Sequence, residues 1–276
     1  MQQVIALEDS RPIYLDLPDP DAEVMSNVRW GRFEDVLTPA FWAAQAWMDP
    51  IHVDDDFALG RSLTEELVAC LLGGHGAPAE VGLAAYQRVA SHLEENGGQL
   101  SLHMATELLS RPLSVNGRQV KYRFANTRAR YLANSLERLA DIDENKLDDV
   151  ALRNSLCTLP GVGPKTASWI VRNRRGSDSV AILDIHIMRA GKMMNVFEQG
   201  ADPARGYFEL ECKFLSFCRS LGVRPSIMDA VMWRTMRIVS PALMDILLSS
   251  SNPVSNPSKY NHGDADVRGR RRQRQG

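Results

Sequence analysis

Long apolar runs are absent from this sequence, and so is a leader-like beginning. No part of the 276-residue chain approaches the about 18 consecutive apolar residues that a membrane-spanning helix needs. The N-terminal stretch MQQVIALEDSRP places no basic group before an apolar segment, as a secretory signal would. We therefore expect a cytoplasmic protein with no membrane partner.

Cysteine is scarce, with four residues at Cys70, Cys157, Cys212 and Cys218. Only the last two lie close together, and no cysteine follows them. A cluster needs several thiolate ligands that meet, so we interpret all four as reduced thiols of the core. The sequence predicts no metal ion and no bound cofactor.

A surplus of positive charge is also missing. The chain has 32 Lys and Arg against 34 Asp and Glu, whereas nucleic-acid-binding domains are usually basic. The charges are unevenly placed, however: residues 8–66 are rich in acidic side chains, and residues 121–130 and 165–175 are rich in basic side chains. A local basic face can bind phosphates within a neutral protein, so the net charge of −2 does not exclude a nucleic acid partner.

What the sequence does contain is helical periodicity in a chain long enough to bury a full core. Apolar residues make up 44% and charged residues 24%, as in globular proteins. The expected fold class is all-α, with one small β-hairpin at Asn116-Gly117. Capping residues and apolar spacing predict helices over AFWAAQAWM after Thr38 and Pro39, and over residues 63–74, 79–96, 100–109, 126–139, 148–157, 165–174, 180–196, 203–221, 225–239 and 241–249.

Both ends of the chain depart from this helical pattern. Residues 1–36 carry three prolines, so we expect an irregular arm with a short strand at IYLDL. The residues after 250 are polar and end in an arginine-rich run, which is typical of a disordered tail. These arginines either add nonspecific phosphate affinity or are simply solvated. The predicted domains are an N-terminal arm with one helix (1–58), a helical domain (59–250) and a basic tail (251–276).

The stretch LPGVG at residues 159–163 breaks one helical pattern, and Pro164 begins another. Gly161 and Gly163 allow a turn so tight that backbone N–H groups point outward together. Such groups at a helix N-terminus form a phosphate site without a basic patch. The pattern is that of a helix-hairpin-helix motif.

The residues around this motif resemble a known family. Lys165 lies on the first turn after the hairpin, and Asp184 follows 19 residues later in ILDIHIMR. Together with KYRFANTRARYL at 121–132, residues 170–189 resemble the helix-hairpin-helix–GPD superfamily of DNA glycosylases. They are most similar to the archaeal-type 8-oxoguanine DNA glycosylase/AP lyases.

This resemblance implies a fold and a partner. It implies a two-lobed helical fold with a DNA-facing cleft between the lobes, acting as a monomer on double-stranded DNA that carries a modified base. It also implies a monovalent cation at the hairpin carbonyls. Some relatives hold an iron–sulfur cluster through four cysteines near the C-terminus, but the cysteine spacing here predicts none.

Lys165 and Asp184 are the candidate catalytic residues. A carboxylate can stabilise the positive charge that develops on the sugar as a base leaves. A lysine amine can attack the sugar and form a Schiff base, which leads to strand cleavage. The alternatives are a phosphate-binding role for Lys165 and a helix N-cap for Asp184, and the family aspartate serves both roles.

Further candidates are expected to contact DNA or the flipped base. Arg128 is the candidate for reading the estranged base, with a solvated helix face as the alternative. For His186 the alternative is a buried structural histidine. The full set of expected DNA contacts is Gly161, Val162, Gly163, Thr166, His186, Asn126 and Arg128.

Asp229 and Trp233 resemble a family LD-x-x-x-W stretch that lines the base pocket, where an aromatic face stacks on the base. Plain core is the alternative for Trp233. The resemblance also implies that relatives read guanine partly through a C-terminus that ends soon after this helix, whereas this chain continues to residue 276.

The main prediction is a DNA glycosylase that excises a modified base, by default one like 8-oxoguanine, with AP lyase activity through Lys165. One alternative is a defence enzyme that removes a hypermodified base, such as a modified cytosine, from phage DNA. A second alternative is a noncatalytic helix-hairpin-helix DNA-binding protein. The pair of Lys165 and Asp184 argues against the second, because binding alone needs only the hairpin backbone.

Overall fold

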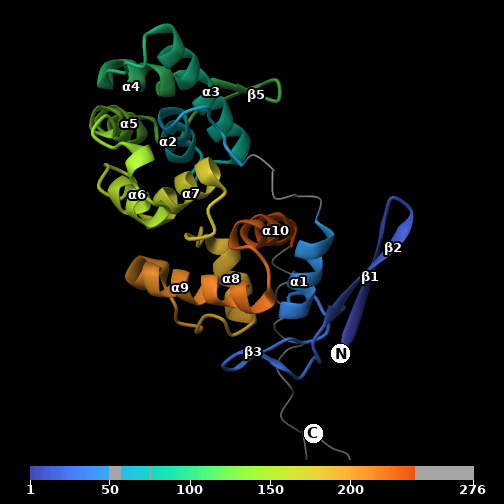
Figure 1. Ribbon diagram of the computed structural model, residues 1–276. Coiled ribbons are helices and arrows are strands. Elements are labelled where there is room, and N and C mark those ends of the chain that lie inside the picture. The colour runs from blue at the N-terminus through green and yellow to red at the C-terminus, as the bar shows by residue number, and fades with distance from the viewer. Residues whose placement is uncertain (50–56, 75, 240–276) are drawn as a thin grey trace, which may run out of the picture. The chain divides into compact units, whose positions relative to one another are not determined.

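The computed structural model describes residues 1–49, 57–74 and 76–239. Its α-helices in these ranges confirm the all-α prediction (Figure 1). The predicted helix over 241–249 and the predicted tail lie outside the described residues. The helices are α1 (Pro39–Met48), α2 (Leu63–Leu72), α3 (Ala79–Glu95), α4 (Leu102–Ser110), α5 (Ala125–Leu139), α6 (Asp149–Leu156), α7 (Pro164–Arg175), α8 (Ile185–Met193), α9 (Pro203–Leu221) and α10 (Pro225–Ile238).

Capping residues fix most of these helix starts. Thr38 Oγ1 accepts a hydrogen bond from the backbone N–H of Phe41 at 3.1 Å, and Ser62 Oγ accepts one from Glu65 at 3.2 Å. Such bonds satisfy N–H groups that have no partner within the helix. Within residues 1–49, 57–74 and 76–239, the structure contains no helix with the length and apolar character of a membrane span.

The N-terminal arm contains two β-hairpins, so the expectation of an irregular arm is wrong, although the predicted strand at IYLDL is present. β1 (Gln2–Glu8) pairs antiparallel with β2 (Arg11–Leu17), and β3 (Glu23–Met25) pairs with β4 (Val28–Arg29). Asp9 and Ser10 both have positive φ, which suits the two-residue turn between twisted strands. The prolines do not prevent pairing, because Pro12 lies next to the turn and the other two follow β2.

The third hairpin was predicted correctly from its turn. β5 (Leu113–Val115) pairs with β6 (Arg118–Val120) across Asn116-Gly117, and both turn residues have positive φ. The hairpin ends at Val120, so Tyr122 lies outside the strand. That tyrosine instead donates its O–H to the carbonyl of Leu72 at 2.8 Å.

A hydrophobic core lies among α2, α3, α5, α6 and α7. Leu67, Leu71, Leu132, Leu152 and Leu156 are among its fully buried side chains. The core also fixes one face of α7, the helix that follows the helix-hairpin-helix turn.

One carboxylate is buried beside this core. Glu66 Oε2 accepts from the N–H groups of Leu59 and Gly60, and Oε1 accepts from Asn173 Nδ2 at 2.6 Å. Buried polar groups are costly unless they are hydrogen-bonded, and these partners satisfy Glu66. The bonds fasten the chain before α2 to the last turns of α7.

The predicted helix over 180–196 is wrong at its start. Val180–Leu183 is buried but not helical, and α8 begins only after Asp184. Asp184 is the N-cap, and its side chain accepts from the N–H groups of His186 and Ile187. A run of four apolar residues has no such cap, so the helix starts at the carboxylate.

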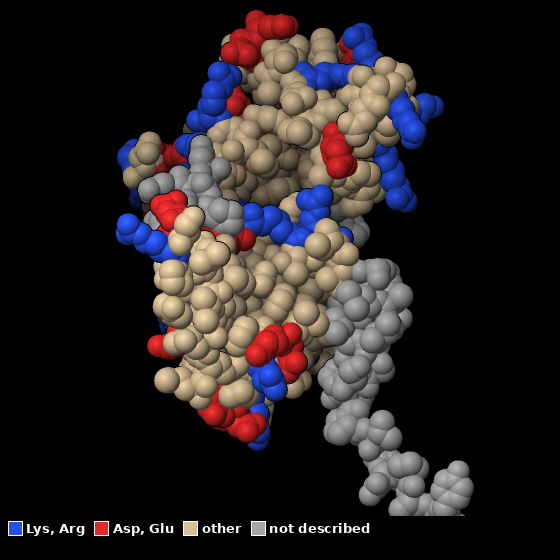
Figure 2. All heavy atoms as spheres, turned by 90° about the vertical axis from the view of Figure 1, so that its right-hand side faces the viewer, with Lys and Arg blue, Asp and Glu red and all other residues tan. Residues whose placement is uncertain are grey.

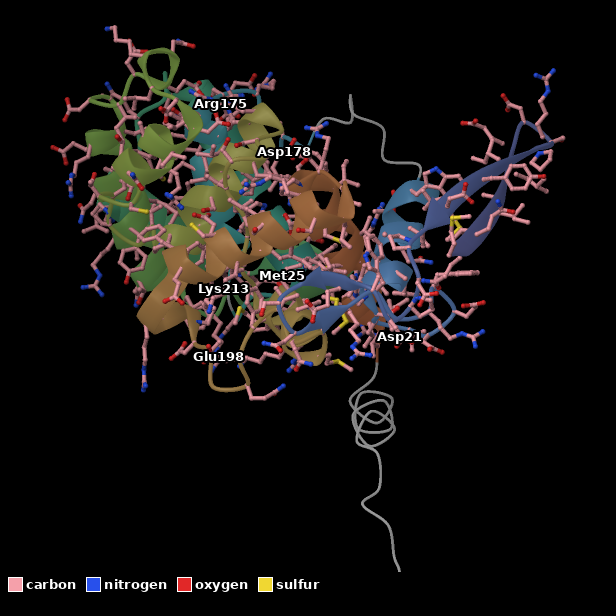
Figure 3. The ribbon with its side chains drawn as sticks, turned by 60° about the horizontal axis from the view of Figure 1, so that its bottom comes forward. Asp21, Met25, Arg175, Asp178, Glu198 and Lys213 are labelled. Atoms are coloured by element: carbon pink, nitrogen blue, oxygen red, sulfur yellow. The ribbon has the colours of Figure 1, made fainter. Side chains whose placement is uncertain are left out.

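Two ion pairs fasten the loops on either side of α8. Asp178 pairs with Arg224 Nε at 2.6 Å and accepts from Ser226 Oγ at 2.7 Å, which joins the loop after α7 to the start of α10. Glu198 lies 3.9 Å from Lys213 Nζ, between the loop after α8 and α9. Asp178, Glu198 and Lys213 can be followed in Figure 3. The first pair holds α10 to the loop after α7, and the second holds α9 to the loop after α8.

Candidate active site

The helix-hairpin-helix turn has one glycine that the fold requires and one that it does not. Gly161 has φ +80°, and a Cβ there would come within 2.4 Å of the Tyr131 ring. Gly163 has an extended φ of −90°, and a Cβ there would meet no atom within 4 Å. Gly161 therefore shapes the turn, whereas Gly163 leaves an open surface where a ligand can approach the backbone.

Lys165 is half-buried on the first turn of α7. Gly163 is the N-cap of this helix and supplies no capping side chain, so the first N–H groups are not satisfied by a cap. These groups carry the positive end of the helix dipole. The start of α7 is thus suited to an anion. Thr166 is half-buried beside it.

Asp184 is half-buried, and its Oδ1 makes both capping bonds, at 2.8 Å to the N–H of His186 and 2.9 Å to that of Ile187. Its Oδ2 makes no hydrogen bond to the residues that the structure describes. The N-cap interpretation is confirmed, and it leaves the second oxygen for another partner. Within the same described part, His186 Nδ1 is buried without a hydrogen-bond partner.

Asp229 on α10 is 5% exposed and lies in the field of both candidate catalytic residues. Burial raises the pKa of Asp229 to about 6; the charge of Arg172 opposes the rise, Asp184 adds to it and Lys165 opposes it. Coulombic effects fall with distance. The structure therefore brings Lys165, Asp184, Arg172 and Asp229 into one electrostatic neighbourhood.

Arg172 is a functional candidate that the sequence reasoning missed. Its guanidinium lies 3.1 Å from Asp229 Oδ2, an ion pair whose angles are not those of a hydrogen bond. Its other face lies over the Phe57 ring, with Cζ 4.5 Å from the centroid. Arg172 follows Lys165 by seven residues, two helical turns, and this spacing was the signal that could have placed it on the same face of α7.

Trp233 lies one turn after Asp229 and is 38% exposed, so the plain-core alternative is wrong. The Arg237 guanidinium lies over its ring at 4.7 Å. One face of the indole thus stacks with a planar guanidinium. A flipped base could stack on such an aromatic face in the same way.

Asn126 and Arg128, the two expected DNA contacts at the start of α5, differ in exposure. Asn126 is exposed and lines a cavity of about 370 Å³ together with Lys121 and Arg123. Arg128 is half-buried instead, with its Cζ 6.0 Å from the Tyr131 ring. Tyr131 also packs on Gly161. Arg128 therefore contacts a side chain that supports the hairpin, and it is only partly exposed.

Comparison with known proteins decides the family. Residues 58–223, more than half of the chain, match the family model for 8-oxoguanine DNA glycosylase. The chain belongs to this family.

Two relatives are described as 8-oxoguanine DNA glycosylase/AP lyase. The one from Thermoplasma volcanium is 27% identical over 180 residues, which cover 62% of this chain and 78% of the relative. The one from Picrophilus torridus is 30% identical over 119 residues, which cover 42% of this chain and 56% of the relative. Among solved structures, a non-covalent Endonuclease III–DNA complex is similar with a TM-score of 0.52 at 18% identity, covering 70% of this chain and 81% of that chain.

Membership in the 8-oxoguanine DNA glycosylase family confirms three predictions. The fold is the all-α helix-hairpin-helix glycosylase fold, the chain is an enzyme, and its partner is DNA. The roles of individual residues stay predictions. The face drawn in Figure 2 has a group of Lys and Arg side chains near its middle, and such a local group can attract phosphates despite the net charge of −2.

The cysteines of this family member are free thiols, but not all lie in the core. Cys70 and Cys218 are buried and Cys157 is half-buried, whereas Cys212 is exposed on α9. The expectation of a core position is wrong for Cys212, because it falls on the solvent side of an amphipathic helix. Over the described ranges, the structure has no group of three His, Cys, Asp or Glu side chains that could hold a metal ion.

Proposed function

We propose that this family member excises an oxidised purine, by default 8-oxoguanine, from double-stranded DNA and then cuts the strand through Lys165. The observation that carries the proposal is the position of Lys165 at the uncapped start of α7, in the same electrostatic neighbourhood as Asp184. The printed names of both relatives, which join glycosylase to AP lyase, support it. We propose that the protein acts as a monomer.

The first chemical step breaks the bond between base and sugar. As that bond lengthens, the sugar becomes positively charged, and the carboxylate of Asp184 stabilises this charge through Oδ2. Lys165 Nζ attacks C1′ as a neutral amine and loses a proton. The base leaves with the bonding electrons and takes up a proton.

The second step cuts the DNA strand. The bond between C1′ and O4′ breaks, O4′ takes up a proton, and Nζ forms a Schiff base with C1′. Loss of a proton from C2′ then expels the phosphate at C3′, so the strand is cut 3′ to the lesion. Asp229, Arg172 and Trp233 are proposed to receive the flipped base, with Trp233 as the stacking surface.

The hairpin backbone is proposed to bind a phosphate through the N–H groups around Val162 and Gly163. A monovalent cation would add positive charge there. One carbonyl of the hairpin could bind such a cation. Gly163 O accepts one hydrogen bond, from the N–H of Ala167 at 2.9 Å, and a carbonyl oxygen has a second lone pair.

The test is a panel of duplexes, each with one 8-oxoguanine opposite a different base, together with duplexes carrying a hypermodified cytosine or no modification. Released base is measured separately from strand nicking, and borohydride is added to trap a Schiff base. We expect release, nicking and a covalent adduct with 8-oxoguanine, and no adduct for Lys165→Gln.

Each alternative gives a different result. Release of modified cytosine without release of 8-oxoguanine would assign a defence substrate. Efficient release by the wild type with no trapped adduct would make Lys165 a phosphate ligand and the enzyme a monofunctional glycosylase. Binding without release from any duplex would contradict the proposal as a whole.

A further inference from the structure

The segment before Asp184, residues 180–183, is buried, and among the described residues it pairs with no strand. Three of its peptide N–H and C=O groups bond to side chains of α9 instead. Tyr207 donates its O–H to the carbonyl of Ala181 at 2.6 Å, and its oxygen accepts from the N–H of Leu183 at 3.3 Å. Glu211 Oε1 accepts from the N–H of Ala181 at 2.9 Å. Two side chains thus supply hydrogen bonds that a neighbouring strand would supply in a β-sheet.

The same carboxylate also bonds to α7. Glu211 Oε1 accepts from Ser168 Oγ at 3.2 Å, and Ser168 lies one turn after Lys165. Glu211 Oε2 pairs with Arg153 of α6 at 2.7 Å. One buried group therefore joins the helix that carries Lys165 to the segment that carries Asp184.

The chemistry of both α9 side chains suits a fixed support. Burial raises the pKa of the Tyr207 phenol above its usual range, so the O–H that it donates to Ala181 stays protonated. Arg153 neutralises Glu211 and lies over the Phe208 ring at 4.4 Å, so the carboxylate is held between a charge partner and hydrogen-bond donors. Buried networks with every member satisfied are rigid.

We propose that Tyr207 and Glu211 are positioning residues that set the distance between Lys165 and Asp184 by fixing residues 180–183 against α7. The inference rests on the proposed function, because its consequence for activity requires that this pair performs the chemistry. Misplacement of a reacting group by about 1 Å can cost about 100-fold in rate.

The first arm of the test uses Tyr207→Phe, which keeps the ring and removes both bonds to the segment. With the best duplex from the panel, at saturating protein, we expect single-turnover base release to fall about 10- to 100-fold, while the Kd for DNA stays within about threefold. Val89→Ala is the matched control, because Val89 is fully buried on α3 and its truncation lowers stability without touching this network. Ser168→Ala removes only the bond between α7 and Glu211, so it should lower the rate of base release by less.

A double-mutant cycle separates positioning from general destabilisation. If Tyr207 acts through Asp184, Tyr207→Phe should cause little further loss in an Asp184→Asn background. Additive losses, or a release rate for Tyr207→Phe equal to that of Val89→Ala, would overturn the proposal.

The second arm needs no substrate. Hydrogen exchange is measured on the free proteins, and the amides of Ala181 and Leu183 should exchange at least about tenfold faster in Tyr207→Phe, with α3 unchanged. If the wild type releases no base from any duplex, the proposed function fails, and this arm alone decides whether Tyr207 fixes the segment. Unchanged exchange at both amides would refute that role.

Discussion

In the proposed mechanism, Asp184 combines two roles through its two carboxylate oxygens. Oδ1 caps α8 and thereby fixes the orientation of the group, and Oδ2 is left for the charge that develops on the sugar. A cap and a catalytic carboxylate are often treated as competing interpretations of an aspartate. Here the first supplies the rigidity that the second needs.

Asp184→Asn should separate these roles. Asparagine also caps helices well, so we expect a change in Tm of no more than a few degrees and unchanged DNA affinity. Base release should fall by orders of magnitude, because the amide carries no negative charge. Single-turnover release and thermal unfolding measure the two effects; Asp184→Ala, which loses both roles, should be about 1 kcal/mol less stable as well. Normal release by Asp184→Asn would remove Asp184 from the chemistry.

Asp229 should make stability depend on pH. Burial raises its pKa from 3.8 to about 6, so between these values the folded protein binds more protons than the unfolded chain. Stability contributed by this group is therefore full below about pH 4 and lost as the pH rises to about 6, by about 3 kcal/mol in total. The groups that act on it are Arg172, Asp184 and Lys165.

Urea unfolding at pH 4–7 tests this prediction. Asp229→Asn should lack that part of the pH dependence, although its overall stability is lower because Arg172 loses its partner. Asp184→Asn should move the transition to lower pH, since a charge that raises the pKa of Asp229 is gone. Parallel pH profiles for wild type and Asp229→Asn would contradict the assignment.

At the scale of single elements, most helix boundaries could be predicted because local residues determine them. Thr38, Ser62 and Pro164 each mark a helix start that the structure contains. Residues 180–183 could not be predicted in this way, because an apolar run looks the same whether helical or extended. What decides its conformation lies 24 to 30 residues further along the chain, in Tyr207 and Glu211.

The residues of the candidate site also differ in whether local sequence could identify them. Gly161, Lys165 and Asp184 could be found because a motif with fixed spacing contains them. Arg172 was missed because its importance comes from its proximity to Asp229, on a helix that is distant in sequence. The strand that pairs with IYLDL was missed because prolines were given more weight than the turn at Asp9 and Ser10.

The two glycines of the hairpin should respond differently to substitution. Gly161→Ala places a Cβ against Tyr131 at positive φ, so we expect a loss of stability of about 1–3 kcal/mol. Gly163→Thr keeps an N-cap, and its Cβ meets nothing within 4 Å, so Tm should change little. Its side chain should nevertheless weaken binding to all duplexes alike, because phosphate contacts carry no sequence information. Weaker binding confined to lesion-bearing DNA would argue against a phosphate site.

At the scale of the whole molecule, charge distribution matters more than net charge. We expect DNA affinity to fall linearly with the logarithm of salt concentration, although the chain carries a formal charge of −2. Lys121→Gln, at the cavity beside Asn126, should reduce the slope by about 1. Lys213→Gln is the control, because Lys213 pairs with Glu209 on α9, and it should leave the slope unchanged. Equal slopes for all three proteins would exclude the cavity from the DNA surface.

The side-chain support of residues 180–183 also has a consequence during synthesis. The helix-hairpin-helix turn and Asp184 leave the ribosome before α9, and until Tyr207 and Glu211 follow, the peptide groups of Ala181 and Leu183 have none of their native partners. A nascent chain can therefore form the helix-hairpin-helix turn before the segment that carries Asp184 has its side-chain supports. If Lys165 and Asp184 perform the proposed chemistry, the order of elements along the chain delays the capacity to cut DNA until α9 has been synthesised.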